Sequence, residues 1–394
     1  MTAPSAAIVG GGLIGLMAAH RLAKNGWRVT VVDAAPEARE ASWAAGGMLA
    51  PHHEADAPTP LWRLGVRSLE RWHELLREEP ADFDAQPGHG LVPADDDPAQ
   101  IAALARRFSW LTTYGVPARW LGRRDIARLQ PRLAPSVHSA LLLPSFAVDP
   151  RKALTAITAA CLRLGVDLRY GTVVAGIAPQ RIDLAPSAQH PVGKPVISAD
   201  EIILASGAWT PVLAAAAKLD LPGEPVQGQM VRLGPPPSGP AGPGAAPLWP
   251  VAPDGPSGPG PSFIHGHGHY LVRRGDGTVV VGATMVRNSF DRRDDPAAIA
   301  HLVAGARRLV PALDAAVVRE TWTGLRPRLR GGLPVIARVA PGLLIATGHF
   351  RNGILLAPIT ADILANLAEH REPLAEALPF TRWPGEFPRE NTTL

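Results

Sequence analysis

Residues 6–33, with the sequence AAIVGGGLIGLMAAHRLAKNGWRVTVVD, decide the fold of this chain. An apolar run over residues 6–9 leads directly into three glycines, and apolar residues then recur with helical spacing over residues 13–25. A β-branched run over residues 28–32 follows and ends on Asp33. This order of strand, tight glycine turn, helix, strand and acid predicts the first βαβ unit of a Rossmann-like fold.

The glycines of this unit predict a dinucleotide site. Their spacing is G-x-G-x-x-G, and it is informative because it stands between a predicted strand and a predicted helix. The first glycine allows the tight turn, the second lets a pyrophosphate approach the backbone, and the third lets the helix pack on the sheet. The helix N-terminus favours an anion, and the acid stands where a ribose hydroxyl would donate to it. The predicted site comprises Gly10, Gly12, Leu13, Ile14, Gly15 and Asp33.

The rest of the chain favours FAD over NAD as the dinucleotide. An NAD dehydrogenase would continue with regular βα units, whereas here a glycine-rich loop at 46–51 and amphipathic helices follow. Buried strands of similar style return late, at 202–205 and 343–346. A dinucleotide domain assembled from distant segments is typical of flavoproteins. Other predicted elements are helices at 61–79, 98–111, 150–164 and 354–367, a strand at 166–170, and a hairpin of strands 269–273 and 278–282.

These elements predict an α/β (α+β) chain of two domains, in keeping with a length of 394 residues. One would be a Rossmann-like FAD-binding domain of discontinuous segments, and the other a substrate domain with a mixed sheet. We expect the first to comprise residues 1–80, 145–215 and 325–394, and the second residues 81–144 and 216–324. Residues 235–261 are saturated with proline and glycine, which predicts a surface insertion.

Composition limits the partners and the location. The formal net charge is +4 and the sequence pI is near 9.6, but the arginines are scattered, so we expect no nucleic-acid partner. A flavoprotein that binds nucleic acid is the alternative from another class. Cys161 is the only cysteine, which excludes an intramolecular disulfide and fits a reducing compartment. We expect no transmembrane segment and a cytoplasmic location; a homo-oligomer stays open.

One group of histidines invites a metal hypothesis that we do not adopt. His265, His267 and His269 alternate with glycines, so on a strand they would share one face. No carboxylate or cysteine accompanies them, and we therefore expect no metal site. His52, His53 and Glu54 follow the glycine-rich loop; a role near the pocket stays open for them, without an assignment.

Three further stretches resemble one family. The first is ASWAAGGMLAP at 41–51, and the second is YLV at 270–272 with VGATM at 281–285. The third is WTGLRP at 322–327 with GHFRNGILLAP at 348–358. With the glycine turn they span nearly the whole chain in the family's order. On these motifs the chain resembles the flavin-dependent amine and D-amino-acid oxidases, including the glycine oxidases of thiamine-type thiazole synthesis.

The resemblance implies a set of substrate residues. Arg326 matches the family's carboxylate-binding arginine, and a guanidinium fork suits a planar carboxylate. Tyr270 matches the pocket tyrosine, Met285 matches a residue of the pocket wall, and Arg351 borders the substrate pocket.

The resemblance also implies which residues contact FAD. Ser42, Gly46, Gly47 and Met48 would line the flavin, and Val174 would contact the adenine side. The segment before the last predicted helix would lie against the flavin ring, where helix-end N–H groups stabilise negative charge. Its residues are Asn352, Gly353, Ile354 and Leu355.

The implied reaction is oxidative deamination of glycine, sarcosine or a small D-amino acid. Hydride transfer to the flavin would give an imine and then an oxo acid and ammonia, with oxygen reduced to hydrogen peroxide. A related dehydrogenase that passes electrons to a membrane acceptor is the alternative. The chain departs from the family after GLRP, where Arg328 and Leu329 replace a small Gly-Thr pair and Arg330 follows. These extra cations leave a more acidic or larger substrate open.

Overall fold

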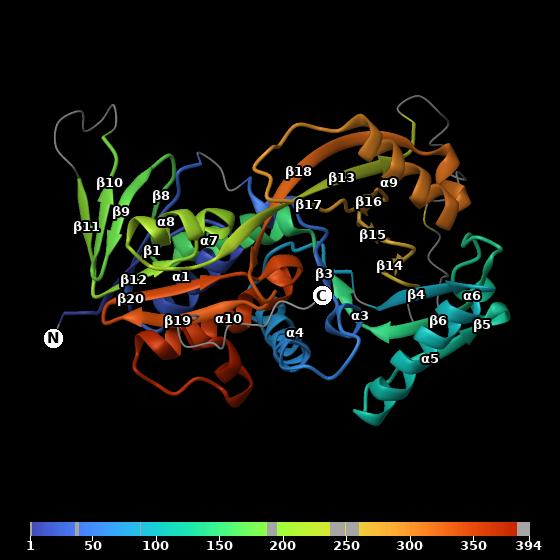
Figure 1. The fold of residues 1–394 in the computed structure, drawn as a ribbon, viewed down its shortest axis with the longest axis horizontal. Coiled ribbons are helices and arrows are strands. Elements are labelled where there is room, and N and C mark those ends of the chain that lie inside the picture. Colours follow the sequence, from blue (N-terminus) through green and yellow to red (C-terminus); the bar gives the residue numbers. More distant parts are fainter. Residues whose placement is uncertain are drawn as a thin grey trace.

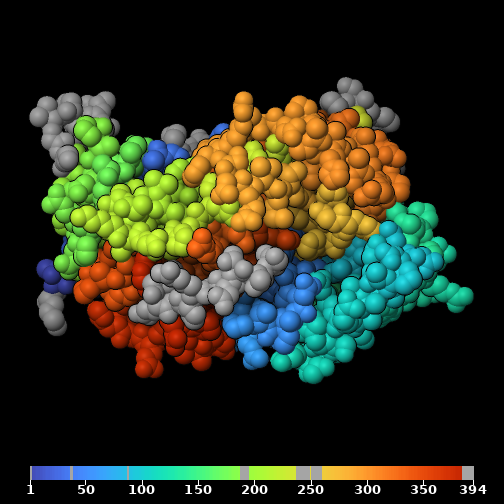
Figure 2. Space-filling model, in the orientation of Figure 1, coloured from blue at the N-terminus to red at the C-terminus, as the bar shows by residue number. Residues whose placement is uncertain are grey.

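Two large sheets lie side by side in the computed structural model (Figure 1). The structure describes residues 2–35, 39–86, 88–186, 195–236, 249 and 260–383. Segments that are far apart in the sequence share each part of the molecule, as the green and red surfaces on the left of Figure 2 show. No helix in the described ranges is long and apolar enough to cross a membrane.

The first sheet has six strands, of which five run parallel and β19 runs antiparallel to β20. Both faces of its central strand are buried because its side chains enter two different cores: Ala6 and Ile8 on one face, Ala7 and Val9 on the other. This explains why the strand reads as a continuous apolar run. Its strands, in spatial order, are β19 (Val335–Ala340), β20 (Leu343–Thr347), β12 (Glu201–Leu204), β1 (Ser5–Val9), β2 (Arg28–Val32) and β8 (Asp167–Arg169).

Helices cover one face of this sheet. α1 packs against α7 and α10, and α10 packs against α4. The indole N–H of Trp72, fully buried in α4, donates to the carbonyls of Ile354 and Leu355 and so fixes the start of α10. The helices are α1 (Leu13–Lys24), α4 (Pro60–Glu78), α7 (Pro150–Arg163) and α10 (Gly353–Ala368).

The opposite face is covered by a small sheet of β9 (Val174–Ala178), β10 (Arg181–Leu184) and β11 (Val196–Ser198), together with α8 (Thr210–Ala216). Between the two large sheets lie α2 (Ala41–Ala44), α3 (Pro51–Glu54) and the strand pair β3 (Met48–Leu49) and β7 (Phe146–Ala147).

The second large sheet has nine strands and is mixed, because β14 pairs parallel with β4 while its other pairings are antiparallel. α9 (Pro296–Leu309) contacts β13, β15 and β16, and α5 (Pro98–Thr113) and α6 (Arg123–Leu129) contact its other end. Its strands are β17 (Val286–Arg287), β13 (Gly223–Gly234), β16 (Val279–Gly282), β15 (His269–Arg273), β14 (Phe263–Gly266), β4 (His89–Asp95), β6 (Val137–Pro144), β5 (Arg119–Gly122) and, paired with β13, β18 (Val317–Leu329).

The predicted fold class and the long elements are confirmed. The predicted helices correspond to α1, α4, α5, α7 and α10, and the predicted hairpin is β15–β16. All strands of the six-stranded sheet fall in the ranges expected for the FAD-binding domain, whereas β18 crosses the expected boundary at residue 325. The domain bounds themselves stay a prediction. Most of the expected insertion at 235–261 lies outside the described residues; Trp249, which is described, is buried and donates to the carbonyl of Pro261.

Candidate active site

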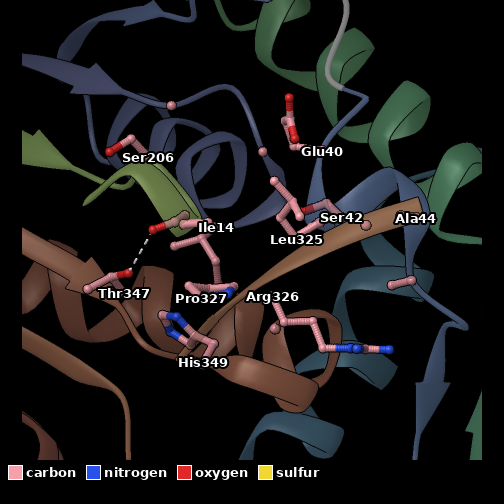
Figure 3. Close-up of a pocket in the computed structure, with 18 of the residues that line it drawn as sticks. Ile14, Glu40, Ser42, Ala44, Ser206, Leu325, Arg326, Pro327, Thr347 and His349 are labelled. Carbon is pink, nitrogen blue, oxygen red and sulfur yellow. Dashed lines mark hydrogen bonds between the residues drawn. The ribbon is translucent and has the colours of Figure 1, made fainter. Parts of the chain in front are cut away.

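A cavity of about 620 Å³ is lined by residues of both large sheets. At one end, Gly10, Ser206 and Thr347 line it where β1, β12 and β20 reach their carboxyl ends. This is the edge at which parallel α/β sheets bind ligands. Figure 3 shows Ser206 and Thr347 on this side, with the Thr347 hydroxyl donating to the carbonyl of Gly207 at 3.2 Å.

The glycine turn leaves the start of α1 open to the cavity. Gly10 has φ +118°, and a Cβ there would clash with the carbonyl of Ala205 in the next strand. Gly12 is the N-cap of α1 without a side-chain cap, and both Gly12 and Ile14 line the cavity. Gly15 packs on the carbonyl of Gly10, where a Cβ would clash. Uncapped N–H groups at a helix start, with room for close approach, suit a pyrophosphate.

Asp33 and Ser42 hold the backbone at this end of the cavity, because their side chains accept hydrogen bonds from its amides. The Asp33 carboxylate lines the cavity and accepts from the amides of Gly11 at 2.6 Å and Ala35 at 2.8 Å. The amide of Leu13 donates to the Ser42 hydroxyl at 3.0 Å. Leu13 is fully buried and does not line the cavity. Val174, at the start of β9, also lines this part of the cavity.

The loop between α2 and β3 forms the middle of the cavity wall, through Ala44, Gly46, Gly47 and Met48 among others. Its carbonyls are held by donors from elsewhere. The indole N–H of Trp322 donates to the Ala44 carbonyl at 2.9 Å. The guanidinium of Arg274, only 3% exposed, donates to the carbonyls of Gly46 and Val148, both at 2.9 Å. A loop fixed in this way forms a rigid surface that would suit a flat ring.

Arg326 stands at the other end of the cavity, on β18. Its guanidinium occupies the space that a Cβ at Gly228 would fill, and its Nη1 donates to the carbonyl of Thr284 at 3.1 Å. Figure 3 shows the side chain extending away from Ser206 and Thr347. In the part of the chain that the structure describes, no carboxylate pairs with it. It is therefore free to bind an anion that enters the cavity.

Tyr270 lies beside Arg326 and against the loop. Its ring fills the space next to Gly46 and Gly282, and its hydroxyl is 3.2 Å from the sulfur of Met230. Burial raises the pKa of the Tyr270 phenol above its ordinary value, and neighbouring Arg326 acts in the opposite direction. The phenol is thus a neutral donor at physiological pH.

The other charged side chains that line the cavity are paired. Glu54 lies 3.2 Å from Arg351, and Glu40 lies 2.6 Å from Arg292, which stacks on the ring of Trp209. Asn352, Gly353, Ile354 and Leu355 also line the cavity, at the start of α10.

Three residues for which the sequence suggested a place at the substrate pocket lie outside the cavity wall. Met285, expected in the pocket wall, is 61% exposed and does not line the cavity; it lies in the short connection between β16 and β17. Arg328 is 2.9 Å from Glu224 and does not line the cavity, and neither does Arg330. The two extra cations therefore add no charge to the cavity wall.

The histidines have structural surroundings. The three histidines expected on one face separate, since a turn at 267–268 places His265 on β14 and His269 on β15. In the described residues no cluster of three or more His, Cys, Asp or Glu side chains could hold a metal ion. His349 lines the cavity and contacts the Thr360 hydroxyl at 3.0 Å; burial lowers its pKa to about 4, so it is neutral near pH 7.

Several lining residues were not found from the sequence. They follow buried strands or belong to loops, and the carboxyl-end rule applied to 202–205 and 343–346 would have found two of them. The missed residues are Glu40, Ser206, Trp209, Arg292, Thr347, His349 and Phe350. Glu54, for which a role near the pocket stayed open, also lines the cavity.

The residues present fit FAD. The open helix start suits the pyrophosphate, the acid Asp33 suits a ribose, and the fixed loop suits a flat ring next to Arg326. One cavity spans all three features. A dinucleotide that extends from the glycine turn would thus end beside the substrate residues.

Comparisons with known proteins agree with this fit. The profile of the family described as FAD dependent oxidoreductase matches residues 5–367. The glycine oxidase of Geobacillus kaustophilus is 30% identical over 382 residues, which cover 95% of each chain. The bifunctional protein ThiO/ThiG of Nostoc sp. is 33% identical over 391 residues, which cover 95% of this chain and 54% of that protein.

A solved structure gives the same result. The crystal structure of glycine oxidase from Geobacillus kaustophilus matches with a TM-score of 0.84 at 29% identity, covering 95% of this chain and 97% of that chain. The predicted family, cofactor and enzyme class are thereby confirmed. The chain belongs to the FAD-dependent oxidoreductase family that includes the glycine oxidases, and it is an amino-acid oxidoreductase whose cofactor is FAD.

Proposed function

We propose that this enzyme oxidatively deaminates glycine or a related small amine or amino acid, such as sarcosine or a small D-amino acid. The observation that carries the proposal is the state of Arg326. Of the three arginines that line the cavity it alone has no carboxylate partner in the described residues, whereas Arg292 and Arg351 are paired. A half-buried guanidinium without a counter-ion favours a carboxylate ligand.

The surrounding groups support the orientation of such a ligand. A carboxylate held by Arg326 can accept a second hydrogen bond from the neutral Tyr270 phenol. The ligand's amine and Cα then lie toward the loop that contains Gly46. When bound, FAD supplies the hydride acceptor, so that the substrate leaves as an imine that water hydrolyses to an oxo acid and ammonia.

Oxygen as electron acceptor, hydrogen peroxide as co-product, a cytoplasmic location and a role in thiamine thiazole synthesis belong to this proposal. Similarity to the glycine oxidase of Geobacillus kaustophilus supports the first two, and similarity to ThiO/ThiG supports the last. The alternative is a dehydrogenase that uses another electron acceptor.

The test is a peroxide-coupled assay of the purified enzyme with glycine, sarcosine, N-ethylglycine and D-amino acids. We expect peroxide in step with substrate consumption. Reduction of a dye without oxygen consumption would favour the dehydrogenase.

Arg326→Ala tests the carboxylate assignment. We expect FAD to stay bound while KM for the best substrate rises by about a hundredfold, because a charge–charge hydrogen bond in a half-buried part of the cavity is lost. Arg328→Gln on the same strand is the control and should change KM less than about twofold, since Arg328 pairs with Glu224 outside the cavity. Equal KM values for Arg326→Ala and the parent enzyme would refute the assignment.

A further inference from the structure

A carboxylate lies close to the substrate end of the cavity. Glu54 is the last residue of α3, and its two oxygens lie 3.3 Å and 3.2 Å from Nη2 of Arg351 in the turn before α10. Both residues line the cavity, and the Glu54 side chain is only 18% exposed. The pair joins segments 297 residues apart.

This pair acts on the same space as Arg326. Arg326, Arg351, Glu54 and Tyr270 all line this one cavity. Burial raises the pKa of the Tyr270 phenol above its ordinary value, and the charges around it act on it as well: the two arginines lower it and Glu54 raises it. Tyr270 therefore lies within the electrostatic range of all three charges. A ligand held between Arg326 and Tyr270 is exposed to them as well.

The side-chain charges of Arg326, Arg351 and Glu54 sum to +1. One substrate carboxylate on Arg326 neutralises the site. A second carboxylate would meet Arg351 already bound to Glu54, together with the repulsion of Glu54 itself. In a half-buried site such a surplus charge is strongly unfavourable.

We propose that Glu54 is a specificity-determining residue that restricts this enzyme to substrates with one carboxylate. Because Glu54 is paired with Arg351, this arginine is not available to bind a second substrate carboxylate. Removal of its charge frees Arg351 and extends the substrate range to dicarboxylic amines. This inference rests on the proposed role of Arg326.

The experiment compares two substrates that share a secondary amine and a reacting methylene. N-ethylglycine carries one carboxylate, and iminodiacetate has a second carboxylate in place of the terminal methyl. In Glu54→Gln, which keeps the size and the hydrogen bond to Arg351, we expect the kcat/KM ratio of iminodiacetate to N-ethylglycine to rise by about thirtyfold. If the double variant Glu54→Gln/Arg351→Gln shows no rise in this kcat/KM ratio, the rise in Glu54→Gln is due to Arg351.

A matched control and a second variant isolate the effect. Glu40→Gln removes another cavity carboxylate that is paired with an arginine, Arg292, and should leave the ratio unchanged. Arg351→Gln leaves Glu54 unpaired and should lower the ratio below that of the parent enzyme. This second variant tests the idea even if Glu54→Gln does not fold.

Binding of unreactive acids gives a readout without turnover. Perturbation of the flavin absorbance by acetate and by malonate yields their Kd values, and the preference for malonate should rise in Glu54→Gln by a similar factor. An unchanged ratio in both assays, with N-ethylglycine still oxidised, would overturn this inference alone. If acetate does not bind the parent enzyme and no carboxylate substrate is oxidised, the role of Arg326 fails, and this inference fails with it.

Discussion

The end of the cavity that we assign to the dinucleotide is built on a glycine turn and a helix start, whereas long side chains line the end that we assign to the substrate. The first end depends on the glycine turn at Gly10 and the open start of α1. The second depends on Arg326, Tyr270 and the Glu54–Arg351 pair. Backbone positions are fixed by the whole fold, while side chains can be exchanged one at a time. We therefore expect changes at the first end to remove the cofactor and changes at the second to alter the substrate.

Gly10→Ala should have the largest effect. The substitution forces a side chain into φ +118° and against the carbonyl of Ala205, so the turn must move. We expect less than about a tenth of the chains to retain FAD, measured as flavin absorbance per chain.

Gly26→Ala is the matched control at the other end of α1. Gly26 also has positive φ, +86°, but a Cβ there would meet nothing within 4 Å. We expect a loss of about 1 kcal/mol of unfolding free energy with FAD still bound. If Gly26→Ala lost FAD as Gly10→Ala does, backbone strain and not the crowded turn would explain both.

Arg274→Met removes a donor that holds the loop between the two ends of the cavity. It leaves the carbonyls of Gly46 and Val148 without their donor, deep in the protein. We expect the FAD-loaded enzyme to lose about 3 kcal/mol of unfolding free energy in urea. Arg273→Met, at the neighbouring half-buried position, should lose less than about 1 kcal/mol; equal losses would contradict the specific role of Arg274.

Acid should destabilise the enzyme through two buried histidines. Burial lowers the pKa of His349 and of His52 to about 4, so both are neutral in the folded protein. An unfolded histidine takes up a proton near pH 6.5, and stability that is fully present above this pH is therefore lost as the pH falls toward 4. The full effect is about 3 kcal/mol for each group. Urea unfolding at pH 7 and pH 5 measures it.

Substitution separates these histidines from the carboxylates. His349→Gln and His52→Gln should each flatten the pH dependence, whereas His301→Gln, at an exposed position on α9, should not. A slope that is unchanged in both buried variants would assign the acid sensitivity to other groups.

Met285→Ala should have the smallest effect and tests whether Met285 lies outside the wall of the substrate end. Met285 is 61% exposed and outside the cavity wall, so KM should change less than about twofold. A larger change would return Met285 to the pocket and would require the segment after β16 to close over the substrate.

The dinucleotide end could be predicted from the sequence because its determinants are local. Gly10, Gly12 and Asp33 lie within one βαβ unit, and glycine spacing together with apolar periodicity specifies that unit. The hairpin β15–β16 was predictable for the same reason.

The substrate end could not be predicted to the same depth because it depends on contacts between distant segments. Nothing near Glu54 in the sequence indicates that it meets Arg351, and nothing near Arg328 indicates that Glu224 neutralises it. The strand order of the nine-stranded sheet also depends on distant segments. β14, at residues 263–266, pairs with β4, at residues 89–95. Resemblance supplied Arg326 and Tyr270, and it also supplied Met285, which lies outside the cavity.

The donors Trp322 and Arg274 have a consequence for engineering. Both belong to the nine-stranded sheet or its hairpin, yet each holds a carbonyl of the segment that forms part of the cavity wall, at Ala44 and Gly46. A chimera that exchanged this sheet for that of another oxidase would remove the anchors of a loop it was meant to leave intact. New substrate ranges should therefore be sought by changing single side chains at the cavity mouth, with the two sheets inherited together.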